Sequence, residues 1–256
     1  MNDETHFIKR AAAADHARFV AEVEGLKALA ATQAVRVPAV IECGCNERES
    51  WLVLERLQLG ALDRSAGAAL GRALAQMHRT TGPHFGWTSD NFIGLAPQEN
   101  APDANWPLFF AHRRLLPQLR RARENGLDRL YMDKGEHLAE RVAAFFISGH
   151  PAPSLLHGDL WSGNAGRLPD GTPVVFDPAV YHGDREADVA MAELFGGFPE
   201  SFYAAYREAW PLSEGFETRK TLYNLYHILN HFNLFGAGYL GQAKRMIDRL
   251  VSELRG

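Results

Sequence analysis

The hydrophobic pattern divides the chain into a short strand-rich start and a long helical remainder. Residues 5–10 predict a short strand with Phe7 and Lys9 on one face and His6 and Ile8 on the other. Residues 15–30 place apolar side chains at helical spacing and predict a helix. Apolar runs at 35–40 and 51–57 predict two further strands on either side of a turn. This part of the chain should form a small sheet with one helix.

From residue 62 onward the periodicity becomes helical. The predicted helices cover residues 62–79, 106–123, 133–149, 202–210, 217–235 and 242–254. Asp133 followed by Glu136 forms a capping box at the start of the third of these. Residues 82–103 are rich in turn-forming residues and should form a loop.

One segment in the middle of the chain departs from the helical pattern. Apolar runs at 155–156 and 174–176 flank a turn signal at 169–171, which predicts a hairpin. Asn164 lies six residues before the centre of that turn and Asp177 seven after it, so both should reach the same open end, roughly 5 Å apart. An amide oxygen and a carboxylate suit Mg²⁺, which completes its shell with phosphate oxygens and water. The hairpin therefore predicts a site for a metal nucleotide.

The residues around this hairpin follow the spacing of a known catalytic loop. Asp159 stands five residues before Asn164, where its carboxylate can meet an incoming hydroxyl. The order H-x-D-L-x-x-x-N, with Asp177 downstream, matches the protein-kinase catalytic loop. The alternative is an ordinary hairpin whose Asp and Asn side chains cap turns. The combination favours phosphotransfer, with Asp159 and His157 as catalytic residues and Asn164 and Asp177 as metal ligands.

A carboxylate interrupts the apolar stripe of the first predicted helix. Glu22 lies three residues after Phe19 and four before Leu26, and therefore on the buried side. A carboxylate directed inward needs a partner, and Lys9 is the nearest candidate in sequence. Kinases use a strand Lys held by a helix Glu to grip the nucleotide phosphates. The alternative is a Glu at a partly exposed helix edge.

Two further segments supply candidate contacts for ligands. The last strand of the small sheet should end in a hinge, where the backbone of Glu55 and Leu57 can pair with an adenine. The loop at 82–103 carries amides, including Gln98 and Asn100, that can line a small-molecule pocket. They can equally serve as turn residues.

Composition narrows the class of protein. A chain of 256 residues with 46% hydrophobic content can bury a full core. A net charge of −4 provides no bulk attraction to nucleic acid or to a membrane surface. Cys43 and Cys45 lack the second pair of ligands that a zinc site needs, and His227 and His231 lack a third. No stretch reaches the roughly 18 apolar residues of a membrane span, so we expect a cytoplasmic protein with free thiols.

Taken together, these motifs resemble the fructosamine kinase (ketosamine-3-kinase) family, within the wider group of aminoglycoside phosphotransferases and choline kinases. The resemblance is carried by HGDLWSGN at 157–164, FDPAVYHGDREADVAMAELFGGF at 176–198, FGWTSDNFIGLAPQEN at 85–100, WPLFFAHRRL at 106–115 and LYNLYHILNHFNLFG at 222–236. It covers nearly the whole chain. HGDxxxxN alone would indicate only the wider group.

The resemblance implies an α+β, protein-kinase-like fold with two lobes. Residues 1–57 would form a small nucleotide-binding lobe and residues 58–256 a larger, mainly helical lobe. Family members carry about two strands and a glycine-rich turn ahead of the Lys strand, whereas only eight residues precede Lys9 here. We therefore expect either a start that lies upstream by roughly 25 to 30 residues or a poor kinase.

The resemblance also implies a reaction. ATP and Mg²⁺ would be the cofactors, with Lys9 and Glu22 at the ATP phosphates and Asp159 as base toward the third hydroxyl of a ketosamine. The phosphorylated product falls apart and releases the sugar, which is a deglycation activity. The substrate candidates are Trp161, Gln98, Asn100 and Trp106.

Three interpretations stay open at this point. The chain can be a ketosamine kinase, a kinase of another small alcohol or amino sugar, or a kinase-like protein with little activity. The ketosamine can be free or attached to a protein, and we expect a monomer.

Overall fold

The structure, a computed structural model, describes residues 6–147 and 149–254. Its strands are β1 (His6–Ala12), β2 (Val40–Cys45), β3 (Glu49–Glu55), β4 (Asn91–Ile93), β5 (Ala96–Gln98), β6 (Ser154–Leu156), β7 (Ala165–Arg167), β8 (Pro173–Val175) and β9 (Tyr181–Gly183). Its α-helices are α1 (His16–Ala31), α2 (Arg64–Met77), α3 (Trp106–Phe110), α4 (Leu116–Glu124), α5 (Arg129–Glu140), α6 (Glu186–Leu194), α7 (Glu200–Ala209), α8 (Phe216–Phe235) and α9 (Leu240–Glu253). A π-helical turn, Ala111–Leu115, joins α3 to α4.

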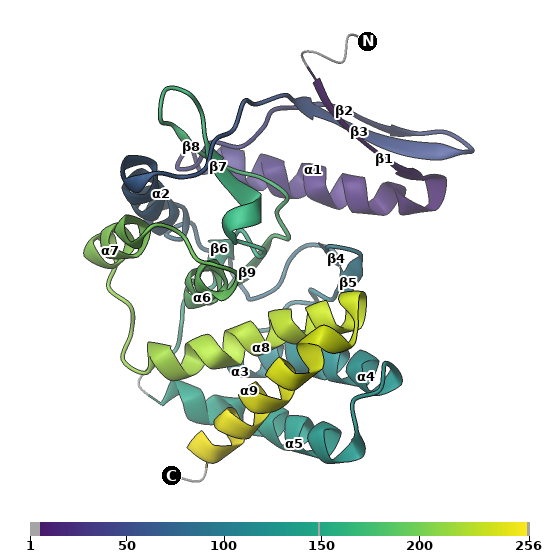
Figure 1. Ribbon diagram of the computed structural model, residues 1–256, viewed down its shortest axis with the longest axis vertical. Helices are drawn as coiled ribbons and strands as arrows, with labels where there is room; N and C mark the ends of the chain where they lie inside the picture. Colours follow the sequence, from purple (N-terminus) through teal and green to yellow (C-terminus); the bar gives the residue numbers. More distant parts are fainter. Residues whose placement is uncertain (1–5, 148, 255–256) are drawn as a thin grey trace.

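A three-stranded antiparallel sheet in the order β1-β3-β2 forms one end of the molecule, and α1 covers one of its faces (Figure 1). Alternation along β3 buries Leu52 and Leu54, which join Leu26 and Leu29 of α1 in the core. Lys9 lies in the middle of β1, opposite Leu52. The strand predicted at 5–10 is confirmed from residue 6 onward, and Thr5 lies outside the described residues.

The strand predicted at residues 35–40 is wrong. β2 begins only at Val40, and the preceding residues form a connection in which Val35 and Val37 are nevertheless buried. Pro38 has no backbone N–H to give to a neighbouring strand, which explains why the pairing starts after it. Burial of two valines therefore produced a strand-like pattern without a strand.

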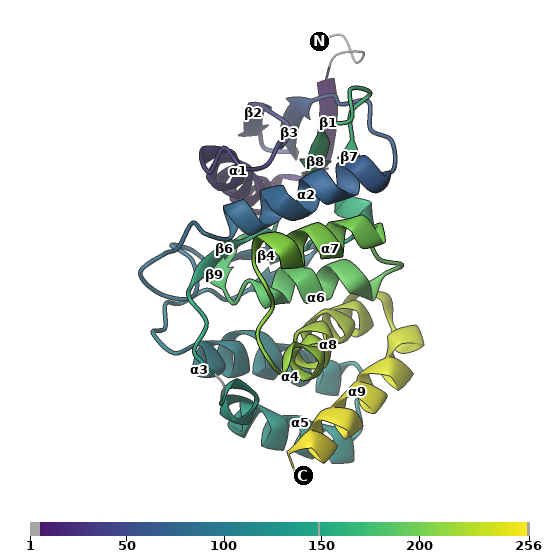
Figure 2. The same cartoon turned by 90° about the vertical axis from the view of Figure 1, so that its left-hand side faces the viewer.

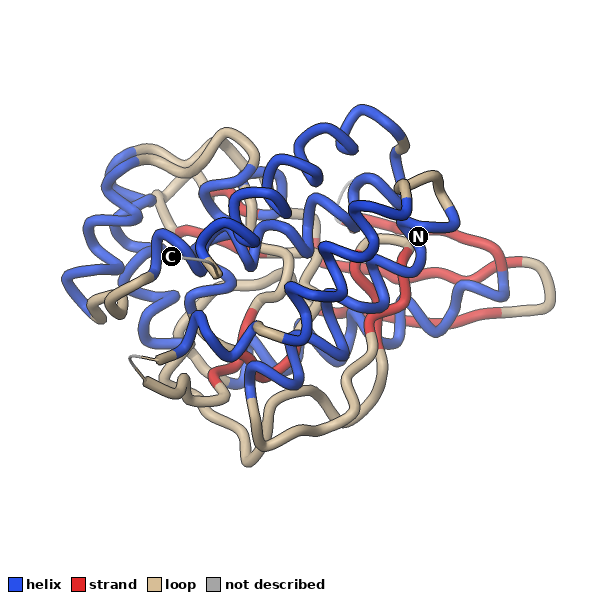
Figure 3. Tube along the Cα trace, turned by 90° about the horizontal axis from the view of Figure 1, so that it is seen from below, coloured by secondary structure: helices blue, strands red, loops and turns tan. Residues whose placement is uncertain are grey.

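The rest of the molecule is mainly helical. α2, α7, α6 and α8 follow one another down the long axis in Figure 2, and α2 packs on α7 while α6 and α9 pack on α8. Seen from below, the longer strands gather at one end and helices fill most of the remainder (Figure 3). The predicted two-lobe α+β fold is confirmed. Among the described residues, no helix combines the length and apolar character that a membrane span requires.

Two local predictions in the helical part are wrong. The helix predicted at 133–149 begins earlier, at Arg129, because the Asp128 side chain accepts the Tyr131 N–H as an N-cap, and Asp133 lies inside the helix. Residues 82–103 contain a short antiparallel hairpin of β4 and β5, turned at Gly94 with φ +59°. Strands of three residues are too short to give a readable alternation.

Candidate active site

The predicted turn closes a hairpin, but the first strand of that hairpin is β7, whereas the apolar residues 155–156 lie in β6 and pair with β9. β7 and β8 pair with Ala165 opposite Val175, and the Phe176 N–H donates to the Asn164 carbonyl at 3.0 Å. Asn164 and Asp177 therefore reach the same end of the hairpin. Asp177 adopts φ +56°, a left-handed conformation that Asp tolerates better than most residues.

A cavity of about 360 Å³ lies at this end of the hairpin, between it, α1 and the β4–β5 turn. Its polar side chains include Lys9, Arg18, Glu22, Asp159, Asn164 and Asp177. Its apolar side chains include Phe92, Leu95, Trp161, Leu234 and Phe235. The cavity thus combines a charged part with an apolar rim.

Lys9 connects two carboxylates in the charged part of the cavity. Its Nζ donates to Glu22 Oε1 at 2.8 Å and to Asp177 Oδ1 at 2.6 Å. Burial opposes the charge on Lys9, but the two carboxylates outweigh it and raise the pKa of the ammonium. Lys9 is therefore protonated at neutral pH, and the predicted contact between Lys9 and Glu22 is present.

Asp159 lies in the catalytic loop and lines the cavity. The Asn164 amide donates to its carbonyl at 2.9 Å and to its Oδ2 at 3.1 Å. Burial raises the pKa of Asp159 to about 7, with a further contribution from the negative charge of Asp177. A carboxylate poised near neutral pH can accept a proton from a substrate hydroxyl.

The backbone of the catalytic loop is held from behind by Asp188. Its carboxylate accepts the N–H groups of His157 at 2.7 Å and of Gly158 at 2.9 Å, and its Oδ2 lies 3.1 Å from His78 Nε2. Gly158 has φ +81°, and a Cβ there would collide with the Ala179 carbonyl oxygen. The loop conformation therefore requires both a glycine and a buried acceptor.

The assignment of His157 as a catalytic residue is wrong. Its side chain is fully buried and does not line the cavity. Nε2 lies 3.1 Å from the Phe176 carbonyl, and the Asp159 N–H donates to Nδ1 at 3.3 Å. His157 thus joins the catalytic loop to the segment just before Asp177.

The substrate candidates on the 82–103 segment are also placed differently from the prediction. Gln98 and Asn100 are buried, where Gln98 accepts the Tyr226 hydroxyl at 2.7 Å and Asn100 accepts Arg114 Nη2 at 2.7 Å. Trp106 is buried as well, with its indole N–H on the Tyr223 hydroxyl. Gln98 and Asn100 both donate to Asn91, which lines the cavity, and Trp161 is the one substrate candidate that lines the cavity itself.

The hinge candidates lie away from the cavity. The Glu55 carboxylate accepts Arg36 Nη2 and the Ala39 N–H, and its backbone N–H donates to the Ala39 carbonyl. Neither Glu55 nor Leu57 is among the residues that line the cavity. The N–H of Glu55 is therefore already taken by the protein.

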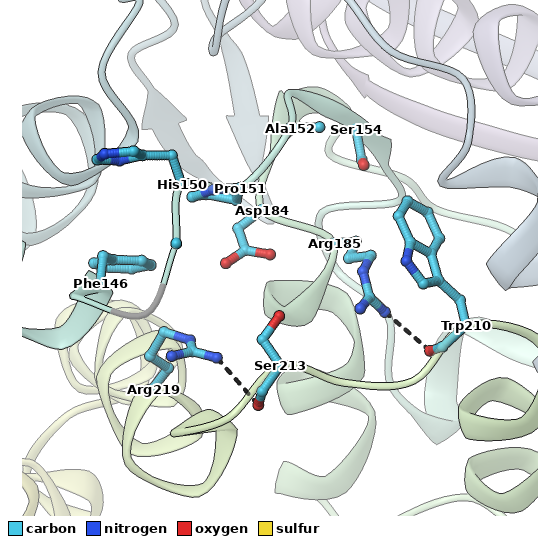
Figure 4. Close-up of a pocket in the computed structure, with 11 residues that line it drawn as sticks. Phe146, His150, Pro151, Ala152, Ser154, Asp184, Arg185, Trp210, Ser213 and Arg219 are labelled. Atoms are coloured by element: carbon cyan, nitrogen blue, oxygen red, sulfur yellow. Dashed lines mark hydrogen bonds between the residues drawn. The ribbon is translucent and has the colours of Figure 1, made fainter.

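A second cavity, of about 190 Å³, lies beside the start of α6 (Figure 4). Asp184 at its wall accepts the Tyr223 hydroxyl at 2.5 Å, and burial together with the nearby Glu186 raises the pKa of Asp184 to about 6. Glu186 in turn accepts Arg219 Nε at 2.8 Å in a buried ion pair. These groups bond to one another and fix the first turn of the helix that carries Asp188.

The sequence predicts that Asp188 orients the catalytic loop through its backbone, which is confirmed, but the partners in this anchoring network were missed. The spacing of Asp184, Glu186 and Asp188 was visible, but their partners are far away in the chain. Arg219 lies 33 residues after Glu186, and His78 lies 110 residues before Asp188. Only the fold brings them together.

The described residues contain no group of three or more His, Cys, Asp or Glu side chains arranged to hold a metal ion. His231 Nδ1 lies 2.8 Å from the His227 carbonyl, one helical turn earlier, and burial lowers the pKa of His227 to about 3. Both histidines are thus packed side chains of α8. Asn164 and Asp177 present the hard oxygen ligands that suit Mg²⁺ with phosphate and water.

A two-lobe fold with a Lys–Glu pair facing a D-x-x-x-x-N hairpin defines a phosphotransferase of the protein-kinase-like group. The chain belongs to the fructosamine kinase family, whose sequence profile matches residues 1–253. A probable ketoamine kinase of Synechocystis is 45% identical over 250 residues, which cover 97% of this chain and 84% of that protein. The chloroplastic protein-ribulosamine 3-kinase of Arabidopsis thaliana is 40% identical over 252 residues, covering 97% and 77%.

Solved structures agree with this placement. The crystal structure of a "putative fructosamine-3-kinase" from Haemophilus somnus matches with a TM-score of 0.89 and 33% identity, covering 96% of this chain and 83% of that one. An aminoglycoside phosphotransferase in complex with ADP and hygromycin B matches with a TM-score of 0.62 at 15% identity, covering 98% and 87%. This second likeness shows the fold alone.

Proposed function

We propose that the protein transfers the terminal phosphate of ATP to the third hydroxyl of a ketosamine, a sugar joined to an amine. The observation that supports this most strongly is Asp159, a carboxylate with a pKa of about 7 at the wall of the cavity that also holds Lys9 and Asp177. Relatives named ketoamine kinase and protein-ribulosamine 3-kinase indicate the class of acceptor. Loss of the sugar from the phosphorylated product would make the reaction a deglycation.

In this proposal each side chain has one task. Asp159 accepts the proton of the sugar hydroxyl while the oxygen of that hydroxyl bonds to the terminal phosphorus of ATP. Lys9, oriented by Glu22, binds phosphate oxygens. Asn164 and Asp177 would hold Mg²⁺, which supplies charge neutralisation between the phosphates.

The apolar side chains at the rim of the cavity can contact the acceptor. Trp161 and the exposed side chains of Leu95 and Phe235 can pack on the sugar and its amine substituent. We also propose a lobe boundary near residue 57, where β3 has ended and the chain leads toward α2.

Phosphorus NMR tests the acceptor. The protein is incubated with Mg-ATP and, separately, with fructose-, ribulose- and erythrulose-amines, choline and an aminoglycoside. We expect a new phosphate resonance on one or more ketosamines and none with the Asp159→Asn variant. Phosphate found only on choline or the aminoglycoside would overturn the ketosamine assignment.

A further inference from the structure

Arg18 is a cation in the wall of the active-site cavity that the reaction above does not use. It lies in the first turn of α1, four residues before Glu22, and so shares a helix face with it. One turn of helix corresponds to about 5.4 Å along the axis, which an extended Arg side chain spans. Burial raises the pKa of Glu22, and the charge of Arg18 acts in the opposite direction, so the two groups sense each other.

The guanidinium of Arg18 has few partners. Among the described residues its ion-pair partner is Asp15, whose Oδ1 lies 3.4 Å from the Arg18 Nε, and this buried Nε makes no hydrogen bond. Arg219, by contrast, donates to one carboxylate and to several carbonyl groups. Arg presents five donors in a planar fork that matches phosphate oxygens. Arg18 is therefore a positively charged donor group directed at a cavity and short of acceptors.

The charge balance of the cavity points to the ligand that Arg18 meets. The single positive charge of Lys9 is already shared between two carboxylates, Glu22 and Asp177. A triphosphate entering the cavity brings further negative charge, and Arg18 is the other cation that lines it. The apolar side chains that line the cavity, such as Leu95 and Phe235, suit the amine substituent of the acceptor better than a phosphate.

We propose that Arg18 binds oxygens of the terminal phosphoryl group of ATP and positions that group for transfer. The inference rests on the proposed function, because it assigns Arg18 a place in the same cavity. Since Arg18 would contact the phosphate that is transferred, it should discriminate between a triphosphate and a diphosphate. A residue that merely stabilised α1 would not.

Calorimetric titration with the magnesium complexes of ADP and of the non-hydrolysable ATP analogue AMP-PNP tests this. Charge-assisted hydrogen bonds are worth enough for Arg18→Met to weaken AMP-PNP binding by roughly 10- to 100-fold, while ADP binding stays within about twofold of wild type. Arg18→Lys keeps the charge but loses the planar fork of donors, so its affinity for AMP-PNP should lie between those of wild type and Arg18→Met. The matched control is Lys27→Met, which removes an exposed cation from the same helix. Thermal unfolding should show all variants folded.

Steady-state kinetics provide a second readout. With saturating ATP, Arg18→Met should lower kcat while leaving the KM for the ketosamine little changed, because the lost contact is to the phosphoryl group. Equal losses of ADP and AMP-PNP affinity would overturn the proposal and make Arg18 a support for Glu22. Unchanged nucleotide affinity would also overturn the proposal. A KM that rose for fructosyl-glycine, which carries a carboxylate, but not for a neutral fructosyl-alkylamine would show instead that Arg18 binds the acceptor.

The binding experiment needs no acceptor, so its outcome is separable from that of the proposed function. Wild-type protein that phosphorylates no ketosamine but retains the predicted difference between AMP-PNP and ADP would reject the acceptor and support Arg18. An active ketosamine kinase without that difference would do the reverse.

Discussion

The carboxylates on the two sides of the catalytic loop differ in how completely they are bonded. On the cavity side, Asp159 accepts one side-chain donor, from Asn164, and Asp177 accepts one, from Lys9. On the interior side, Asp188 accepts two backbone N–H groups and contacts His78, and Glu186 accepts Arg219 and the Ser213 N–H. Carboxylates with free lone pairs can still bind or react, whereas saturated ones hold the fold.

The pKa values of Asp159 and Asp188 show the same contrast. Burial is the largest influence on both carboxylates, and the two differ in how strongly their partners oppose it. The pKa of Asp159 rises to about 7. For Asp188, burial is outweighed by hydrogen bonds and charge from its partners, and its pKa falls below the usual range. Variants on the two sides of the catalytic loop test this contrast.

Asp177→Asn should have the largest effect on activity. Replacing the carboxylate removes a ligand charge for Mg²⁺ and one of the two partners of Lys9, while Asn tolerates the left-handed backbone. We expect activity at physiological Mg²⁺ to disappear and the melting temperature to stay near that of wild type. Rates measured across a Mg²⁺ titration provide the check, and an unaltered Mg²⁺ dependence would contradict the ligand assignment.

Asp159→Asn should come next. Removing a positioned general base lowers turnover by roughly 10²- to 10⁴-fold, and nucleotide affinity should hardly change because Asp159 faces the acceptor. Comparing kcat with the calorimetric affinity for AMP-PNP separates these effects. Near wild-type turnover would rule Asp159 out as the base.

Arg219→Met tests the interior side. It leaves Glu186 buried without its cation, and breaking a buried pair from one side costs about 3 to 5 kcal/mol in free energy of unfolding. Arg207→Met is the matched control, because Arg207 pairs with Glu200 at the surface and its loss should cost at most about 1 kcal/mol. Urea unfolding measures both variants, and equal losses would mean that burial does not distinguish the two pairs.

His227→Gln should have the smallest effect, visible only as a change in pH dependence. Burial keeps His227 neutral with a pKa of about 3, whereas an unfolded His titrates near 6.5. The unfolded chain therefore binds the extra proton between these values, and stability is lost as pH falls below 6.5, by on the order of 1 to 2 kcal/mol at pH 5.

The difference between melting temperatures at pH 7 and pH 5 should accordingly be smaller in His227→Gln than in wild type. His137→Gln, at an exposed position of α5, should leave that difference unchanged. The same pH sensitivity in all three proteins would mean that other groups control acid unfolding.

The sequence predicted best where the information was local. The turn of the hairpin and the spacing of Asp159, Asn164 and Asp177 depend on about 20 consecutive residues and formed as expected, whereas the apolar run at 155–156 pairs with β9 and not with β8. The contact of Lys9 with Glu22 was accessible because a charge on an apolar stripe demands a partner nearby. The two-lobe fold was expected from the resemblance to the fructosamine kinase family, and the change from strand to helical periodicity agrees with it.

The misplaced residues share a physical cause. Gln98, Asn100 and Trp106 are polar or amphipathic, and composition alone cannot tell whether such side chains face a ligand or a buried partner. Their partners Tyr226, Arg114 and Tyr223 come from other segments. His157 was misassigned for the same reason, since its acceptor is a backbone carbonyl 19 residues away.

The ion pair of Lys9 with Asp177 has a mechanical consequence. Lys9 belongs to the sheet and Asp177 follows the hairpin, and both line the cavity. Their ion pair therefore joins the sheet to the hairpin at the cavity wall. A bound triphosphate would compete with Asp177 for the same ammonium. Nucleotide binding would then be coupled to the breaking of an ion pair that joins the sheet to the hairpin.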